Sequence, residues 1–460
     1  MRKLLVIGLD SAPPELVFEK FRDKLPNISA LMENGVYARM RSCHPPITVP
    51  AWMVMATSKS PGKLGLYGFR HRKGYAYTGG WIANSQSVRE EKVWDILARA
   101  GNQVCLVGVP PSYPPSPVKG NMISCFMTPG SDREYTYPPE LKKEVEGLVG
   151  PYPFDVEFRI DNREELHKNL IDMTEKHFQV IEHLLTTREW DFFMFVEIGL
   201  DRMHHAFWKY FDKTHPKYEK GNQFEAVALD YYLRLDEHIG RLIAFVPEET
   251  VVVVVSDHGA KGMRGAFCVN EWLIQEGYLV LKEEPRGVVE IDKAMVDWTR
   301  TKAWAWGGYY ARVFFNVKGR ETNGVIDPVD LKREQGELTR RLKEIRDPTG
   351  RLMETKVYRP EELYPVSVGD KPDLIVYFDD LYWRSAGTIG HGGLYLAEND
   401  TGPDDAVHAQ YGIFIMRDKE LRRRGKVPDI DILDVMPTLL SRLGVSVPST
   451  MEGKPVSWLS

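Results

Sequence analysis

Three apolar segments of this chain each end next to an aspartate, and histidines follow closely behind two of these aspartates. The aspartates are Asp10, Asp201 and Asp257. Helix capping accounts for any one of them, because a carboxylate that precedes a helix accepts a backbone N–H. Three of them, two with histidine, instead favour a metal site, since carboxylate and imidazole groups are ligands of zinc, manganese and iron.

The spacing of the histidines supports this interpretation. Asp201 and His205 are four residues apart in "GLDRMHHAFW", so a helix would place both side chains on one face. Asp257 and His258 are adjacent in "SDHGA", and in a continuing strand their side chains would diverge. Both can reach one ion only if the strand ends there, and we expect Gly259 to supply the turn.

These residues make five candidate ligands, which exceed the needs of one ion. A tetrahedral zinc takes about four ligands, and a catalytic zinc site keeps one position open. We therefore predict two ions, because two metals roughly 4 Å apart are a recurrent device for in-line displacement at phosphorus. His204 directly precedes one ligand and is expected to point away from the ions. The five candidate ligands are Asp10, Asp201, His205, Asp257 and His258.

A candidate nucleophile lies in "PPITVPAWMVMAT". Thr48 stands just before a predicted helix, and backbone N–H groups at a helix N-terminus bind phosphate. A hydroxyl activated by a metal ion can attack phosphorus and form a covalent intermediate. Taken alone, Thr48 would be interpreted as a helix N-cap, but beside two metal ions we predict that it is the nucleophile.

The elements that must position these residues follow from the alternation of short β-branched runs with longer helical patterns. "TVVVVVSD" is apolar on both faces, which is typical of a central strand in a parallel sheet. The alternation predicts an α/β fold with a mostly parallel central sheet and helices on both faces. Such sheets hold ligands beyond the carboxyl ends of their strands. The expected strands are Leu4–Leu9, Val104–Val109, Phe192–Ile198, Thr250–Ser256, Val313–Asn316, Leu374–Phe378 and Gly412–Met416.

We expect residues 1–460 to form a single catalytic domain with inserted subdomains. Two segments fit the alternating pattern poorly, namely residues 110–152, which are rich in proline and tyrosine, and residues 260–370. We predict that both are insertions or cap regions, where substrate contacts are often found.

The composition excludes several classes of partner. A net charge of -5 over 460 residues provides no basic field for duplex nucleic acid or for a membrane surface. The four cysteines are far apart and form no CxxC pair, which is typical of reduced thiols in a cytoplasmic protein. We therefore expect a cytoplasmic protein that binds a small molecule, and the oligomeric state is left open.

Several stretches resemble the metal and nucleophile motifs of the alkaline phosphatase superfamily. They are "GLDS", "PPITVPAW", "DRMHHAFW", "SDHG" and "DILDVMPTLLSRLGVSVP", in this order along the chain. The sequence is most similar to the type I phosphodiesterase/nucleotide pyrophosphatase branch of that superfamily. The resemblance covers most of the chain and implies an alkaline phosphatase-like fold.

The resemblance also implies a mechanism and a distribution of ligands. Thr48 would attack the phosphorus of a phosphoric diester, and the resulting phosphothreonine would then be hydrolysed. The two divalent ions are expected to be zinc, with manganese or iron as alternatives. One ion would be held by Asp10, Thr48, Asp257 and His258, and the other by Asp201, His205 and a later histidine.

Two histidines compete for that last position. His391 lies between glycines, whereas His408 lies four residues before Gly412, at the amino end of an expected strand. The rule that ligands lie at the carboxyl ends of strands favours His391. Members of the family place a ligand histidine shortly before a strand similar to "YGIF", which favours His408. We predict His408, because spacing to a strand is more specific than a glycine context.

Other functions within the superfamily stay open. Phosphomonoesterases of the superfamily hold the phosphate oxygens with an arginine, and Arg70, Arg72 and Arg264 are candidates for that arginine here. Because none of them can be assigned, we favour a diesterase over a phosphomonoesterase or phosphomutase. A non-catalytic binding protein is disfavoured by the complete set of ligand residues. Asn84 is expected in a surface turn, with a substrate contact as the alternative.

Overall fold

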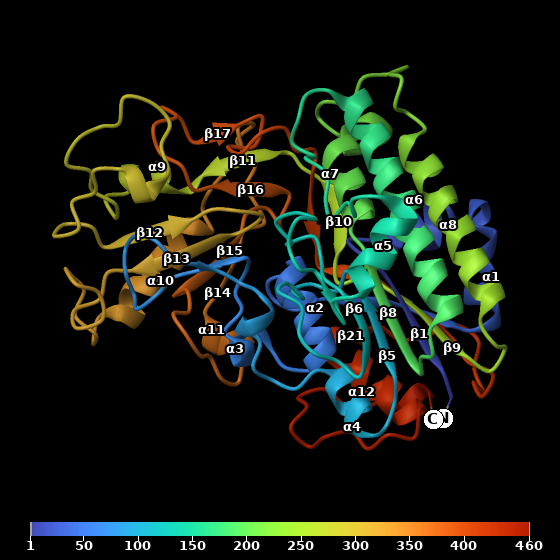
Figure 1. Cartoon of the computed structure of the whole chain (residues 1–460). Coiled ribbons are helices and arrows are strands. Elements are labelled where there is room, and N and C mark those ends of the chain that lie inside the picture. The colour runs from blue at the N-terminus through green and yellow to red at the C-terminus, as the bar shows by residue number, and fades with distance from the viewer. Residues whose placement is uncertain (1, 460) are drawn as a thin grey trace. The chain divides into compact units, whose positions relative to one another are not determined.

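Apolar runs of the sequence lie side by side in the middle of a ten-stranded sheet (Figure 1). The computed structural model describes residues 2–459 and orders the strands β20-β2-β19-β9-β1-β8-β5-β6-β7, with β21 paired to β2. The bounds are β1 Leu4–Leu9, β2 Val36–Arg41, β5 Val104–Val107, β6 Gly120–Ile123, β7 Thr136–Tyr137, β8 Phe192–Glu197, β9 Val251–Val255, β19 Tyr411–Arg417, β20 Gly425–Lys426 and β21 Ile430–Asp431.

Most neighbouring strands of this sheet are parallel. β1 pairs in parallel with β8 on one side and with β9 on the other, and β5 continues the sheet in the same direction. β19 is the exception in the middle of the sheet, because it runs antiparallel to both β9 and β2. The prediction of a mostly parallel central sheet is confirmed.

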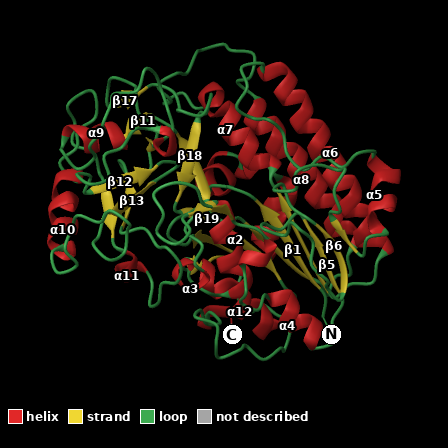
Figure 2. Ribbon diagram, turned by 60° about the vertical axis from the view of Figure 1, so that its left-hand side comes forward, coloured by secondary structure: helices red, strands yellow, loops and turns green. Residues whose placement is uncertain are grey.

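The central strands are buried on both faces, and helices cover them. Every residue of β1, β8 and β9 is buried, as expected for strands that are apolar at nearly every position. Figure 2 shows α6 and α8 on one side of these strands and α2, α4 and α12 on the other. The bounds are α1 Pro26–Asn34, α2 Thr48–Thr57, α3 Pro61–Leu64, α4 Val93–Arg99, α5 Leu141–Val149, α6 Arg163–Thr187, α7 Gly199–Phe211, α8 Val227–Phe245 and α12 Ile432–Arg442.

The chain divides into two compact units. Unit 1 contains the central sheet and comprises the chain up to Leu64, Ala83–Ala260 and the chain from His408 onward. Unit 2 comprises Gly65–Ile82 and Lys261–Val407. No helix of the described residues is long and apolar enough to span a membrane.

Unit 2 is built on smaller sheets. One sheet has the order β12-β13-β15-β14 with antiparallel neighbours, and another has the order β16-β11-β17. Trp304, Phe314 and Phe378 belong to its apolar core. Its main elements are β11 Gly265–Cys268, α9 Val269–Gln275, β12 Ala303–Trp306, β13 Ala311–Phe315, α10 Leu331–Leu342, β14 Lys356–Tyr358, α11 Pro360–Leu363, β15 Leu374–Tyr377, β16 Trp383–Ala386 and β17 Tyr395–Leu396.

The segment boundaries differ from those expected from the sequence. Residues 110–152 contribute two short strands, β6 and β7, to the edge of the central sheet. Unit 2 extends beyond the expected 260–370 to Val407 and includes Gly65–Ile82. All seven expected strands are present within two residues at each end, but β13 and β15 lie in unit 2.

We predict that Ile7→Ala destabilises unit 1 by about 3 kcal/mol, because Ile7 is fully buried in the middle of the sheet and its loss leaves a cavity. Urea unfolding measures the change. Leu233→Ala on α8 is the control, since Leu233 is 39% exposed and its truncation should cost less than about 1 kcal/mol. An equal decrease in the free energy of unfolding in both variants would show that β1 is not in the most tightly packed layer.

Candidate metal centre

Strand ends of unit 1 converge on one edge of the central sheet. Gly8 of β1 is in register with Val196 of β8 and Val255 of β9, so the three strands end together. The chain leaves them through Asp10, through the first turn of α7 and through "SDHG". This edge therefore receives all three of the aspartates singled out in the sequence.

The first group consists of Asp10, Asp257 and His258, whose nearest ligand atoms all lie within 4.8 Å of one another. The Nε2 atom of His258 is 3.2 Å from Oδ2 of Asp257 and 3.7 Å from Oδ1 of Asp10. The hydroxyl of Thr48 lies 3.3 Å from the same Nε2 atom. All four side chains are buried, so an ion here would be enclosed by protein.

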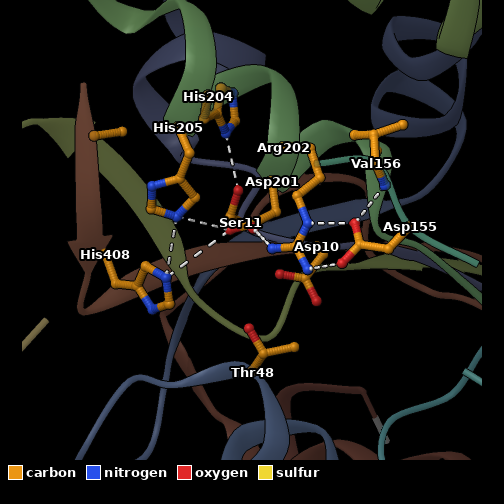
Figure 3. Close-up of polar contacts among 12 residues, drawn as sticks. Asp10, Ser11, Thr48, Asp155, Val156, Asp201, Arg202, His204, His205 and His408 are labelled. Carbon is orange, nitrogen blue, oxygen red and sulfur yellow. Dashed lines mark hydrogen bonds and ion pairs between the residues drawn. The ribbon is translucent and has the colours of Figure 1, made fainter. Parts of the chain in front are cut away.

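The second group consists of Asp201, His205 and His408 (Figure 3), again with ligand atoms within 4.8 Å of one another. The Nε2 atom of His205 is 3.3 Å from Oδ1 of Asp201 and 3.4 Å from Nε2 of His408. The rings of His258 and His408 stack with centroids 3.8 Å apart, so the two groups are direct neighbours.

The chemistry of these atoms fits cations. Oδ1 of Asp10, Oδ1 of Asp201 and Oδ2 of Asp257 are buried and have no hydrogen-bond partner among the described residues. A buried carboxylate oxygen without a partner is costly, and a bound metal ion satisfies it. Each of these oxygens faces the Nε2 atom of a histidine in its own group, which is the arrangement of a shared ligand sphere.

Hydrogen bonds from neighbouring residues fix the candidate ligands on the side that faces away from the other ligands. Trp52 donates its indole N–H to Oδ2 of Asp10 at 2.8 Å, and Nδ1 of His408 lies 2.8 Å from the carbonyl of Pro46. Such contacts orient ligand rings and carboxylates around a metal. Trp52 can approach β1 because residue 8 is glycine, where a Cβ would come within 2.7 Å of the indole ring.

Arg202 is a residue of the site that our sequence reasoning missed, although it follows Asp201 directly. Its Nη1 atom donates to Oδ2 of Asp201 at 2.7 Å, and its Nε and Nη2 atoms both donate to Asp155 at 2.7 Å (Figure 3). Phe158 lies under the guanidinium at 4.6 Å. The arginine thus links a ligand carboxylate to a second carboxylate and is fixed by both.

His204 points away from the two groups, as expected, and has a role of its own. Its Nδ1 atom is 2.9 Å from the hydroxyl of Ser11, and its Nε2 atom is 3.2 Å from the hydroxyl of Tyr232. Ser11 follows Asp10 and has a φ of 61°, a left-handed conformation that few side chains adopt without support. We infer that His204 stabilises the turn that presents Asp10.

The carboxylates have strongly shifted pKa values. Burial, followed by repulsion from a neighbouring carboxylate, raises the pKa of Asp10 and of Asp257 well above the usual range. Burial acts on Asp201 too, but His205 and Arg202 outweigh it and hold the pKa of Asp201 well below its usual value. A cation beside the first pair would favour their ionised form, because opposite charge lowers a carboxyl pKa.

Three buried histidines of the site have pKa values that are shifted toward the neutral form. Burial lowers the pKa of His258 to about 4 and that of His204 to about 3, and it lowers the pKa of His408 well below its usual value. Near pH 7 these imidazoles are therefore uncharged, which is the form that coordinates metal ions.

The two late histidines lie in different parts of the structure, and strand direction explains the position of His408. His408 lies on β18 (Ala406–Ala409), just before β19, and β19 is antiparallel to β9. Its amino end therefore lies at the same edge as the carboxyl ends of β1, β8 and β9. His391 lies in unit 2, where its Nε2 atom is 2.7 Å from the hydroxyl of Thr388.

Other residues singled out in the sequence have identifiable places. Thr48 is the first residue of α2 rather than its cap, which is Ile47. Gly259 does not turn the chain through a positive φ; instead it allows close packing, since a Cβ there would lie 2.1 Å from the carbonyl oxygen of Tyr411. Asn84 caps a short 3-10 turn, where Oδ1 accepts the N–H of Gln86 at 2.9 Å.

The three arginines considered as phosphate ligands all lie in unit 2. Arg72 is paired with Glu321, and Arg264 is paired with Asp379. Arg70 lines a cavity of that unit.

Comparisons with known proteins identify a family and a common fold. The sequence model of the family described as type I phosphodiesterase / nucleotide pyrophosphatase matches residues 4–404. Human ectonucleotide pyrophosphatase/phosphodiesterase 5 aligns over 100% of this chain and 98% of its own, with 12% identity and a TM-score of 0.58. An inactive threonine-to-alanine variant of the murine protein, in complex with AMP, aligns over 100% and 98%, with 13% identity and a TM-score of 0.57. At these identities, the likeness shows a common fold. No curated protein matches the sequence.

We predict that His408→Ala loses about one metal ion per chain, because it removes one of three clustered ligands of the second group. Elemental analysis of protein purified without chelator measures the stoichiometry. His391→Ala is the matched control and should retain the full metal content. The reverse pattern would show that spatial clustering in unit 1 does not identify the ligands.

Proposed function

The chain belongs to the type I phosphodiesterase/nucleotide pyrophosphatase family, and we propose that it hydrolyses small phosphoric diesters at a two-metal centre with Thr48 as nucleophile. The observation that carries this proposal is the pair of adjacent ligand groups, each with buried carboxylate oxygens that lack a hydrogen-bond partner. Zinc is the proposed metal, with manganese or iron as alternatives, since the donor set combines carboxylate and imidazole.

The first ion would be held by Asp10, Asp257 and His258 together with Thr48, and the second by the group that contains His408. When bound, such ions lower the pKa of coordinated hydroxyls and neutralise charge on the phosphate. The Thr48 hydroxyl is the only uncharged oxygen that we place in the ligand set. Its position at the first turn of α2 supports a role in phosphate chemistry, because the first N–H groups of a helix have no partner within the helix.

The proposed reaction has two steps. Oγ1 of Thr48 attacks phosphorus, the bond from phosphorus to the leaving alcohol or phosphate breaks, and the proton of the Thr48 hydroxyl ends on the leaving group. Water then attacks the phosphothreonine: its hydroxyl stays on the released phosphate product, and its other proton restores the Thr48 hydroxyl. The murine relative supports this assignment, because its variant with one threonine replaced by alanine is described as inactive.

The proposed substrate class is a small phosphodiester, including nucleotide derivatives. The murine relative is described in complex with AMP, which is a product of nucleotide pyrophosphatase chemistry. Arg202 also supports a diesterase over a phosphomonoesterase. It is the arginine beside the site, and its donors are directed at Asp155 and Asp201 rather than left for the additional charge of a monoester.

We predict that Thr48→Ala lowers kcat by roughly a thousand-fold or more, because a covalent nucleophile is lost while binding groups remain. Thr48→Ser should retain part of the activity. Steady-state kinetics with bis-p-nitrophenyl phosphate, together with metal analysis of each variant, make the measurement. Wild-type kcat in Thr48→Ala would restrict Thr48 to a structural role at the helix start.

We also predict that bis-p-nitrophenyl phosphate is cleaved with a higher kcat/KM than p-nitrophenyl phosphate. The physical reason is that a monoester carries one more negative charge, and the donors of Arg202, which bonds to a candidate ligand carboxylate, are already directed at Asp155 and Asp201. Both rates are measured with the same metal-loaded preparation, and EDTA treatment should abolish both. A clear preference for the monoester would move the assignment to a phosphatase or mutase.

A further inference from the structure

Unit 2 contains a cavity of about 180 Å³ that is separate from the residues of the metal centre. Its walls combine charged, hydroxyl and aromatic side chains with the backbone of several glycines. The residues used below are Arg312, Arg384, Asp292, Asp400, Thr388 and Trp306.

Arg312 on β13 is a buried cation without a carboxylate partner. It is 8% exposed, and no carboxylate of the described residues lies within ion-pair distance of it. Its Nη1 atom donates to the backbone carbonyl of Arg70, while its Nε atom is buried and has no hydrogen-bond partner. The guanidinium lies over the ring of Trp306 at 5.2 Å, which fixes its plane but does not neutralise its charge.

Arg384 on β16 is the second buried guanidinium of the cavity. Its side chain is 7% exposed, and its Nε and Nη1 atoms have no hydrogen-bond partner. The nearest carboxylate oxygens, on Asp400 and Asp404, are 4.0 and 3.8 Å away, which is beyond hydrogen-bond distance. Nη2 makes only a long contact of 3.5 Å to the hydroxyl of Thr401.

Other arginines of unit 2 form close hydrogen-bonded pairs with carboxylates, unlike Arg312 and Arg384. Arg320 donates two hydrogen bonds to Asp373 at 2.8 and 2.7 Å, and Arg351 donates two to Asp379 at 3.1 and 2.6 Å. Guanidinium groups normally obtain such partners, because a buried unpaired charge is costly. Of the two arginines of the cavity, Arg312 therefore lacks an anionic partner, and Arg384 has only the distant carboxylates of Asp400 and Asp404.

Glu290, Asp292 and Asp400 are the acidic residues that line the cavity, and two of them accept hydrogen bonds from the protein. Asp400 accepts the hydroxyl of Thr388 at 2.9 Å. Oδ2 of Asp292 accepts the N–H of Gly79 at 3.1 Å, while its Oδ1 is buried without a partner. A ligand that satisfies the cavity must therefore bring an anionic group for the arginines and a hydrogen-bond donor for Asp292.

We propose that this cavity binds a small hydroxyl-bearing organic phosphate, with its phosphate on Arg312 and Arg384 and a hydroxyl on Asp292. A phosphate fits better than a carboxylate because the two guanidinium groups come from different strands, and the tetrahedral group offers oxygens in several directions. This site is distinct from the metal centre and does not depend on the reaction proposed there.

Glycerol 1-phosphate is the probe, and calorimetric titration of the metal-loaded full chain measures its binding. All titrations use a Thr48→Ala background, so that the probe is not turned over. We expect Arg312→Met and Arg384→Met each to weaken binding by about tenfold or more, because a charge-assisted pair is lost. Arg351→Met, an arginine of the same unit outside the cavity, should leave the affinity within about twofold.

Further measurements distinguish binding in this cavity from binding at the metal centre and from a loss of folding. Metal content should stay unchanged in all cavity variants, and Arg312→Met should not lower the melting temperature of the unliganded protein, since an unpaired buried charge is removed. Asp292→Asn should weaken glycerol 1-phosphate more than inorganic phosphate. If Arg312→Met fails to fold, Arg384→Met and Arg312→Lys carry the test.

Two results would overturn the proposal. An affinity for glycerol 1-phosphate that neither Arg312→Met nor Arg384→Met changes would place the bound phosphate elsewhere. Equal affinity for malonate and glycerol 1-phosphate would show that the cavity does not select phosphate.

Discussion

Mutual repulsion among three buried carboxylates is the constraint on which the surroundings of the metal centre depend. The ligand oxygens of Asp10 and Asp257 lie within 4.8 Å of one another, and two such charges repel by about 3 kcal/mol at an effective dielectric constant of about 20. Trp52 and Arg202 satisfy one side of two of the carboxylates. The opposite sides face imidazoles and a hydroxyl, and a positive charge in the space between them would offset the repulsion. The strand ends of the sheet hold these groups together. The favourable packing of the sheet offsets the unfavourable repulsion among the carboxylates.

Much of this arrangement could be predicted from the sequence because it depends on local patterns. The apolar runs that form β1, β8 and β9 are continuous, and a carboxylate follows each of them within a few residues. Parallel strands end at one edge, so residues far apart in the chain meet there. The proximity of Asp201 and His205 could be predicted from helical periodicity alone, and both residues lie on α7.

Other features depend on tertiary contacts that no local pattern records. β19 runs antiparallel to β9 and β2, and this direction cannot be inferred from the sequence of β19. If β19 were parallel to its neighbours, His408 would lie at the opposite edge of the sheet from the aspartates. Arg202 stands beside a ligand in the sequence, yet its function follows from Asp155, 47 residues away. The inclusion of β6 and β7 in the central sheet likewise depends on pairing with β5, which proline- and tyrosine-rich sequence did not indicate.

The order of the ligands along the chain has a consequence for biosynthesis. Asp10, Thr48, Asp257 and His258 all precede Lys261–Val407, the larger segment of unit 2, whereas His408 is the first residue after that segment. Because a chain emerges from the ribosome from its N-terminus, the first group can assemble before most of unit 2 has been synthesised. The second group remains incomplete until the chain has returned from unit 2 and added β19 to the sheet. Binding of the proposed second ion would therefore come late in maturation, after the whole of unit 2 has been synthesised.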